Sequence, residues 1–193
     1  MILSDREIKK LVEDKKAVST KKGPSINMDK QLGPSSLDLR LGYTFGILNT
    51  RKVEMIDTKD MSKYNQYIEE EKHSSEDGVI VHPGEFILGT TLETVDMPDD
   101  IVGRVEGRSS YGRLGIIIHT TAGFIDSGFK GQITLEIQNL GNVPVKIYPE
   151  DRICQIAFET MSSPAEIPYG KKTDSKYMNQ EGATFSRLKN EKR

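Results

Sequence analysis

Residues 132–139 read Gln-Ile-Thr-Leu-Glu-Ile-Gln-Asn, so apolar and polar side chains alternate strictly along this stretch. Alternation with a period of two predicts a half-buried β-strand whose apolar face, including Leu135, points into a core. The opposite face carries Thr134 and Glu136 and lies either in solvent or along a cleft. In a cleft, Glu136 is a candidate general base.

The strand pattern extends outward from this stretch over residues 79–158. Short apolar runs recur there at intervals of about 8–12 residues and are separated by turns such as His82-Pro83-Gly84-Glu85. This rhythm predicts a mainly β fold, as a sandwich, barrel or jelly roll, rather than βαβ units. Residues 36–41 also alternate, which predicts an earlier strand with its three leucines facing inward.

The flanking segments predict less regular structure. Ser4 and Glu7 have the spacing of a capping box, which predicts a short N-terminal helix that docks one apolar face. Residues 18–34 are typical of a loop. Residues 54–78 predict a solvated excursion with a short helix around Tyr64–Glu71, and no chemistry is assigned to them. We expect one domain over residues 1–193, in which residues 165–193 form a flexible C-terminal lid or tail.

Composition excludes several classes of protein. The 193 residues carry 27 Lys and Arg against 29 Asp and Glu, which argues against nucleic-acid binding through a broad basic surface. No apolar run approaches the ~20 residues that span a membrane, and no signal peptide is recognisable. One cysteine, Cys154, excludes an internal disulfide and suggests a cytoplasmic protein. One Cys and three His also argue against a zinc site.

Small, polar and charged residues concentrate in residues 106–115, which contain two arginines, two serines and three glycines. Glycines allow a ligand to approach the backbone closely, and N–H groups, hydroxyls and guanidinium groups suit phosphate oxygens. The alternative interpretation is a Gly-rich turn with solvated arginines.

Two ordered motifs resemble the dCTP deaminase family of the dUTPase-like superfamily. They are Gly107-Arg108-Ser109-Ser110-x-Gly112-Arg113-Leu114-Gly115 and, after His119, the run Thr121-Ala122-Gly123-x-Ile125-Asp126 that continues to Leu135-Glu136. Further similar segments lie at residues 2–5, 34–42, 82–85, 163–165, 168–169, 175–177 and 180–182, so the resemblance covers nearly the whole chain. It implies a distorted jelly roll or β-barrel, a homotrimer with active sites at subunit interfaces, and zinc-independent hydrolysis of dCTP to dUTP and ammonia.

The resemblance also implies roles for individual residues. Glu136 would be the catalytic acid and base, with Ser109 and Arg113 positioning the water and the ring. Tyr169 and the tail would close over the nucleotide as a lid. Mg²⁺ would bind through the nucleotide phosphates without protein ligands, and dTTP would be a possible inhibitor, as it is in the family. The implied substrate-binding residues are Arg108, Ser109, Ser110, Tyr111, Gly112, Arg113, Asp126, Thr134, Leu135, Glu136, Gln155, Tyr169, Lys176 and Gln180.

Gly123 and Phe124 resemble the bifunctional members, which convert dUTP further to dUMP and pyrophosphate. A compact glycine leaves room for a second water, which Asp126 could orient. Three alternatives remain: a deaminase that stops at dUTP, a dUTPase-type pyrophosphatase, and a trimer that binds nucleotides without turning them over. We expect His119 to be a packed or hydrogen-bonded residue rather than a catalytic one.

Overall fold

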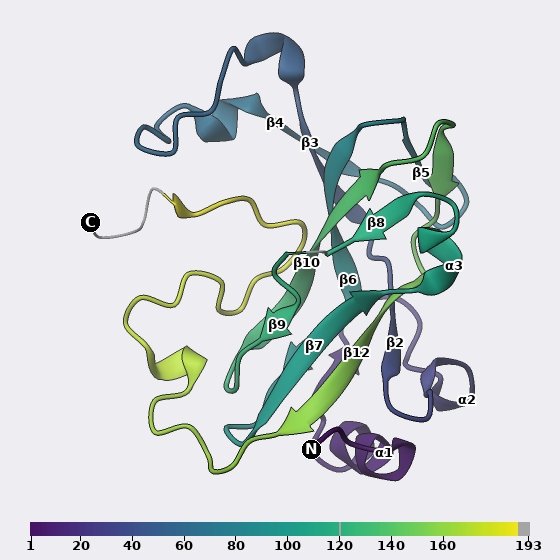
Figure 1. Ribbon diagram of the computed structural model, residues 1–193, viewed down its shortest axis with the longest axis vertical. Coiled ribbons are helices and arrows are strands. Elements are labelled where there is room, and N and C mark those ends of the chain that lie inside the picture. Colours follow the sequence, from purple (N-terminus) through teal and green to yellow (C-terminus); the bar gives the residue numbers. More distant parts are fainter. Residues whose placement is uncertain (120, 189–193) are drawn as a thin grey trace.

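Two antiparallel β-sheets enclose the core of the computed structural model, which describes residues 1–119 and 121–188 (Figure 1). The larger sheet has the order β4-β3-β6-β10-β8, with β1 also paired to β6, and the second has the order β2-β12-β7-β9. Strands β11 and β5 form a separate pair. The mainly β architecture predicted from the apolar rhythm is therefore confirmed.

The strands of the larger sheet are β1 (Val18–Thr20), β3 (Thr44–Leu48), β4 (Ile68–Lys72), β6 (Phe86–Asp96), β8 (Ile116–Ile118) and β10 (Lys130–Asn139). The strands of the second sheet are β2 (Leu37–Arg40), β7 (Ile101–Gly107), β9 (Phe124–Ile125) and β12 (Arg152–Thr160). The two-stranded sheet joins β5 (Val79–Val81) to β11 (Val145–Ile147). The helical segments are α1 (Asp5–Glu13), α2 (Met28–Gln31), α3 (Ser109–Gly112) and the 3₁₀ turns η1 (Thr50–Lys52), η2 (Tyr64–Tyr67) and η3 (Tyr169–Lys171).

Strand β10 has the two faces that its sequence predicts. Leu135 and Ile137 are fully buried in the core, whereas Thr134 and Glu136 on the other face are only half-buried. On β2, the alternating leucines are fully buried as well. The period-two pattern thus identifies correctly which side of each strand faces the core.

The N-terminal helix is present as α1, and the amide of Ser4 donates to the Glu7 carboxylate over 3.1 Å, as the capping box requires. The interpretation of residues 18–34 as a loop is only partly correct, because β1 and α2 lie within them. A buried ion pair holds this segment in place. Arg40 Nε lies 2.7 Å from Glu93 Oε1, and the Arg40 guanidinium also donates to the Pro24 carbonyl at 2.8 Å.

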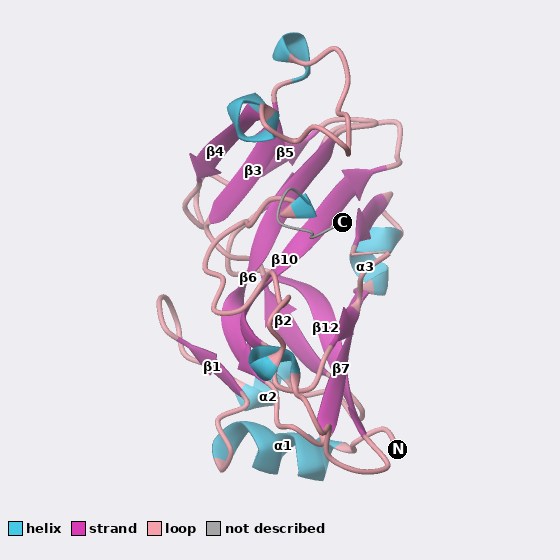
Figure 2. Cartoon of the chain, turned by 90° about the vertical axis from the view of Figure 1, so that its left-hand side faces the viewer, coloured by secondary structure: helices cyan, strands magenta, loops and turns pink. Residues whose placement is uncertain are grey.

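The excursion at residues 54–78 differs from the prediction. In place of a helix over residues 64–71, a 3₁₀ turn is followed by strand β4, which pairs with β3 along its whole length. Figure 2 shows β4 and β3 side by side at one end of the molecule.

The described part of the tail lies against strand β10. The amide of Asn179 donates to the Lys130 carbonyl over 2.7 Å, and the amide of Gln132 donates to the Gln180 carbonyl over 3.0 Å. A parallel bridge between Gly131 and Gln180 completes this contact. In the described part of the chain, no helix is long and apolar enough to cross a membrane.

Candidate active site

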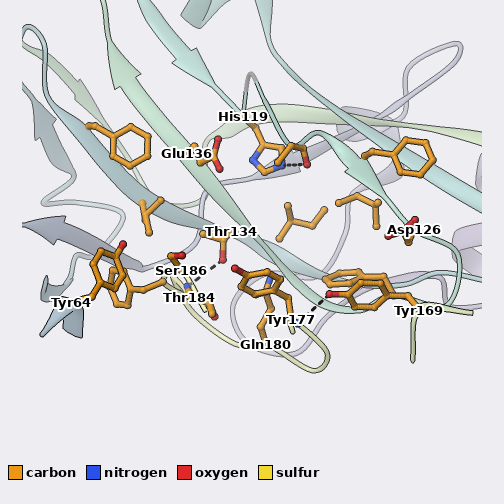
Figure 3. Close-up of a pocket in the computed structure, with 18 residues that line it drawn as sticks. Tyr64, His119, Asp126, Thr134, Glu136, Tyr169, Tyr177, Gln180, Thr184 and Ser186 are labelled. Atoms are coloured by element: carbon orange, nitrogen blue, oxygen red, sulfur yellow. Dashed lines mark hydrogen bonds between the residues drawn. The ribbon is translucent and has the colours of Figure 1, made fainter. Parts of the chain in front are cut away.

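A cavity of about 480 Å³ lies over the half-buried face of β10 (Figure 3). Its floor includes Thr134 and Glu136, and one wall is formed by His119, Ala122, Phe124, Ile125 and Asp126. The tail provides the opposite wall between Tyr169 and Ser186. The polar face of β10 therefore lines a cleft, which was one of the two possibilities that the sequence left open.

Glu136 is held in the lining of this cavity by a neighbouring hydroxyl. Thr121 Oγ1 donates a hydrogen bond to Glu136 Oε2 over 3.0 Å. The side chain is half-buried, so water and a ligand can both reach the carboxylate. A carboxylate with this access can accept a proton from a water and return it to a bound molecule.

His119 sits beside Glu136 with a left-handed backbone at φ +55°. Its Nε2 lies 2.9 Å from the Ala122 carbonyl oxygen, so Nε2 carries the proton and donates. Burial lowers the pKa of His119, an effect that the nearby Glu136 charge partly opposes. The ring is thus a neutral, packed and hydrogen-bonded histidine. Its buried Nδ1 has no hydrogen-bond partner within the described chain.

The far end of the cavity is lined by Asp126, Tyr169 and Gln180. The Tyr169 ring packs against Phe129 edge-on at 5.9 Å between centroids, and its hydroxyl accepts from the Tyr177 amide at 3.2 Å. Gln180 Nε2 donates to the Gln132 carbonyl over 2.7 Å. Its Oε1 is buried and has no hydrogen-bond partner among the described residues.

Gly123 directly precedes strand β9 and lies between two residues that line the cavity, Ala122 and Phe124. A Cβ atom at this position would lie 2.6 Å from the Val105 carbonyl oxygen, so a side chain requires the backbone to move. The Gly123 carbonyl accepts from the Val105 amide at 2.7 Å, which fixes this close approach. The neighbouring Phe124 is exposed and lines the cavity.

The Arg-Ser-Ser cluster lies elsewhere in the chain, on helix α3 and its flanks (Figure 1). Ser109, Ser110, Gly112 and Arg113 are exposed and do not line the cavity of their own chain. Arg108 lies outside it as well, where its Nε is 3.3 Å from Asp38 Oδ2. A single chain therefore separates the predicted residues into two groups, one around Glu136 and one around α3.

The remaining predicted residues also lie outside the cavity lining. Tyr111 donates its hydroxyl to Asp151 over 3.2 Å, and burial with the nearby Asp151 charge raises the pKa of Tyr111 to about 12. Gln155 accepts from the Ser36 hydroxyl at 3.0 Å. Leu135 points into the core, so its side chain does not reach the cavity. Lys176 lies in the tail, where its carbonyl accepts from the Arg187 guanidinium.

The sequence did not identify several cavity residues: Tyr64, Phe86, Leu88, Tyr177, Thr184, Phe185 and Ser186. Tyr64 is the most unexpected, because it comes from the excursion to which no chemistry was assigned. No pattern in the sequence marks these residues as a group. Within residues 1–119 and 121–188, no group of three or more His, Cys, Asp or Glu side chains could hold a metal ion.

Comparison with known proteins gives consistent results. Residues 2–161 match the family described as dCTP deaminase-like. The chain is 53% identical over 189 residues to the "dCTP deaminase, dUMP-forming" of Dictyoglomus thermophilum, covering 97% of this chain and 95% of that protein. It is 50% identical over 192 residues to the protein of the same name from Methanosphaera stadtmanae, covering 97% and 94%.

A solved structure supports the fold. The 2'-deoxycytidine 5'-triphosphate deaminase of Agrobacterium tumefaciens superposes with a TM-score of 0.63 at 24% identity. The similarity covers 82% of this chain and 47% of that one. The fold predicted from the family resemblance is thereby confirmed.

Proposed function

Because the chain belongs to the dCTP deaminase family, we propose that it converts dCTP to dUMP in two hydrolytic steps. It first deaminates dCTP to dUTP and ammonia, and then hydrolyses dUTP to dUMP and pyrophosphate in the same site. The observation that carries this proposal is the position of Glu136, which occupies the floor of the cavity within the family's own motif.

Glu136 performs the proton transfers of the first step. Its carboxylate takes a proton from a water, and the resulting hydroxide attacks C4 of the cytosine ring. Glu136 returns that proton to N3 of the ring. It then takes the proton of the new C4 hydroxyl and gives it to the amino group, so that the C4–N bond breaks, the C4 carbonyl forms and ammonia leaves. The hydrogen bond from Thr121 holds the carboxylate in position for these proton transfers.

Asp126 serves the second step. A water oriented by its carboxylate attacks the α-phosphorus of dUTP, and the bond to the β-phosphate bridge breaks to release pyrophosphate. The support is local: Asp126 lines the cavity, and Gly123, three residues before it, packs closely against the Val105 carbonyl.

Ser109 and Arg113 enter this site from a neighbouring copy of the chain in a homotrimer. Their exposure on α3, away from their own cavity, supports this arrangement. So does a pair of apolar side chains beside them, Leu114 at 56% and Leu140 at 63% exposed. The Leu140 amide donates to the Gly115 carbonyl at 2.8 Å, which places the two next to the α3 turn. Exposed apolar groups of this kind are typical of subunit contacts.

The triphosphate is held by Arg108, Ser109 and Ser110 of that neighbour, together with Lys176 and Gln180. Mg²⁺ binds to the phosphate oxygens, as it does in most nucleoside triphosphate complexes. We place the enzyme in the cytoplasm, where its substrate is found, and we expect dTTP to compete for the site.

A time course tests the proposal. Purified protein is incubated with dCTP and Mg²⁺, and dCTP, dUTP and dUMP are resolved by ion-exchange chromatography beside a matched reaction with dUTP. Accumulation of dUMP from both substrates supports the two-step reaction. Accumulation of dUTP alone indicates an enzyme that stops after deamination. Consumption of dUTP with dCTP untouched would replace the deaminase with a pyrophosphatase.

A further inference from the structure

Three residues form a row across the larger sheet, and two of them, Leu88 and Glu136, line the cavity. Gly46 on β3 pairs with Leu88 on β6, and Leu88 pairs with Glu136 on β10. Residues in register on neighbouring strands point to the same face, so all three face the cavity side. Two strand spacings separate Gly46 from Glu136, about 10 Å.

Phe185 of the tail occupies the space above Gly46. The three atoms nearest to the point where a Cβ would stand on Gly46 all belong to the Phe185 ring. Gly46 is buried although it has no side chain, and Phe185 also lines the cavity. Because residue 46 has no side chain, the Phe185 ring, about 140 residues further along the chain, can pack directly on the backbone of β3.

The residues on either side of Phe185 are held by polar contacts of modest strength. The Ala183 amide donates to Thr44 Oγ1 over 3.2 Å, and the Thr184 amide donates to Thr134 Oγ1 over 3.1 Å. A backbone hydrogen bond from Ser186 acts on the Tyr64 phenol, which lies beside Ser186 and Thr184 in Figure 3. The half-buried Phe185 ring is the large apolar group among these contacts, so its packing on Gly46 contributes to holding this part of the tail.

We propose that Phe185, seated on Gly46, is the positioning residue that keeps the tail closed over the cavity. Tyr64, from the segment 54–78, stabilises the same part of the tail through its hydrogen bond with the Ser186 backbone. Closure brings Tyr177 and Gln180 to the site, so the position of Phe185 sets the affinity for nucleotide rather than the chemistry at Glu136. This effect on affinity rests on the proposed function, whereas the docking of the tail does not.

The test uses the variants Gly46→Ala and Phe185→Ala and their combination. A methyl group on Gly46 meets only the end of the Phe185 ring among its nearest neighbours, so it should displace the tail and leave β3 intact. Tail release is measured without nucleotide, as the rate of trypsin cleavage after Arg187, followed by mass spectrometry. The Arg187 guanidinium is held by the Lys176 carbonyl and lies over the Tyr177 ring at 5.6 Å, so cleavage requires the tail to open. Ile167→Ala, at an exposed apolar position near the start of the tail, is the matched control.

We expect each single variant to cleave about tenfold faster than the wild type, because losing part of one buried aromatic contact shifts a local opening equilibrium by roughly that factor. The KM for dCTP should rise by a similar factor while kcat changes less. In the double variant, Gly46→Ala should add nothing to Phe185→Ala, because the methyl group no longer meets a ring.

Two results would overturn the proposal. One is a cleavage rate in Gly46→Ala equal to that of Ile167→Ala and the wild type. The other is that Gly46→Ala speeds cleavage after Arg187 by the same factor in the wild type and in Phe185→Ala. This would indicate a general disturbance of β3. If the variants are cleaved faster but the wild-type protein does not turn over dCTP, the role of Phe185 in closing the tail is supported and the proposed activity is rejected. The failure of one proposal can therefore be told from the failure of the other.

Discussion

The backbone amide of His119 donates a hydrogen bond to the backbone carbonyl of Glu136 over 2.8 Å. This bond extends the β8–β10 pairing by one residue and fixes the corner at which the chain leaves the sheet. Both side chains consequently line the same cavity. Burial lowers the pKa of His119, so at neutral pH an uncharged imidazole lies beside the Glu136 side chain.

Replacing Glu136 with Gln keeps the size of the side chain and removes its ability to accept a proton. We expect ammonia release to fall at least about 100-fold, since general acid–base catalysis contributes roughly 10²–10⁴-fold. Thermal unfolding should change little, because the side chain is only half-buried. Glu13→Gln on helix α1, far from the cavity lining, serves as the control and should keep the wild-type rate. Ammonia release near the wild-type rate in Glu136→Gln would refute the assigned role.

Mixed trimers test whether the α3 residues act on a neighbouring cavity. Arg113→Ala and Glu136→Gln each should inactivate the enzyme. In trimers reassembled at random from equal amounts of both variants, about one quarter of the interfacial sites should combine an intact Arg113 with an intact Glu136. Activity should therefore recover to about a quarter of the wild-type value. Each parent variant, dissociated and reassembled alone, is the control. Failure to recover activity would mean that both residues must come from one chain, or that the subunits do not share a site.

The sequence was sufficient to predict the strands whose structure is determined by a local pattern of side chains. The alternation in residues 132–139 gave both the strand and the face on which Glu136 lies, because side-chain period and burial are coupled in any half-buried strand. Strand β4 was missed because Ile68–Lys72 carries mostly charged side chains, which are typical of solvent. Its conformation comes from backbone pairing with β3, a non-local contact that side-chain patterns do not encode.

The candidate site was predictable only in part for a related reason. Asp126, Tyr169 and Gln180 were identified from motifs, and the structure brings all three to the cavity of Glu136. Phe185 and Tyr64 belong to no motif, and they reach the cavity through contacts between segments more than 100 residues apart. Such packing depends on the final fold, so composition and spacing could not reveal it.

The pKa of His119 predicts a pH dependence of stability. Burial lowers this pKa below its ordinary value of 6.5, so between that lowered value and pH 6.5 the unfolded chain binds a proton that the folded chain does not. The free energy of unfolding should therefore decrease as the pH falls below about 6.5. His119→Asn tolerates the left-handed backbone and should remove this contribution. Urea unfolding of both proteins from pH 5 to pH 8 measures the difference, and parallel curves would exclude His119 as its source.

The Arg40–Glu93 ion pair predicts a large loss of stability on substitution. Glu93 is fully buried and Arg40 nearly so, and Gln31 Nε2 donates to Glu93 at 3.0 Å. Glu93→Gln leaves the Arg40 guanidinium buried without its counter-charge, which should cost about 3 kcal/mol of unfolding free energy. Urea denaturation at fixed protein concentration measures the loss. The exposed pair Lys9–Glu13 offers the control, and its Glu13→Gln variant should keep the wild-type midpoint. Equal midpoints for both variants would show that the buried pair contributes no net stability.

The close packing of Gly123 predicts that a side chain at this position changes which product accumulates from dCTP. A methyl group at this position meets the Val105 carbonyl at 2.6 Å, so Gly123→Ala must shift the wall that carries Phe124 and Asp126. Asp126 then no longer aligns its water with the α-phosphate. Glu136 lies on a different strand, and only its hydrogen bond from Thr121 comes from the stretch next to residue 123. A misplacement of about 1 Å can slow a positioned step on the order of 100-fold. We therefore expect dUTP to accumulate from dCTP with ammonia release retained, as resolved by ion-exchange chromatography. Parallel loss of both products would instead mean that residue 123 supports the whole site and does not separate the two reactions.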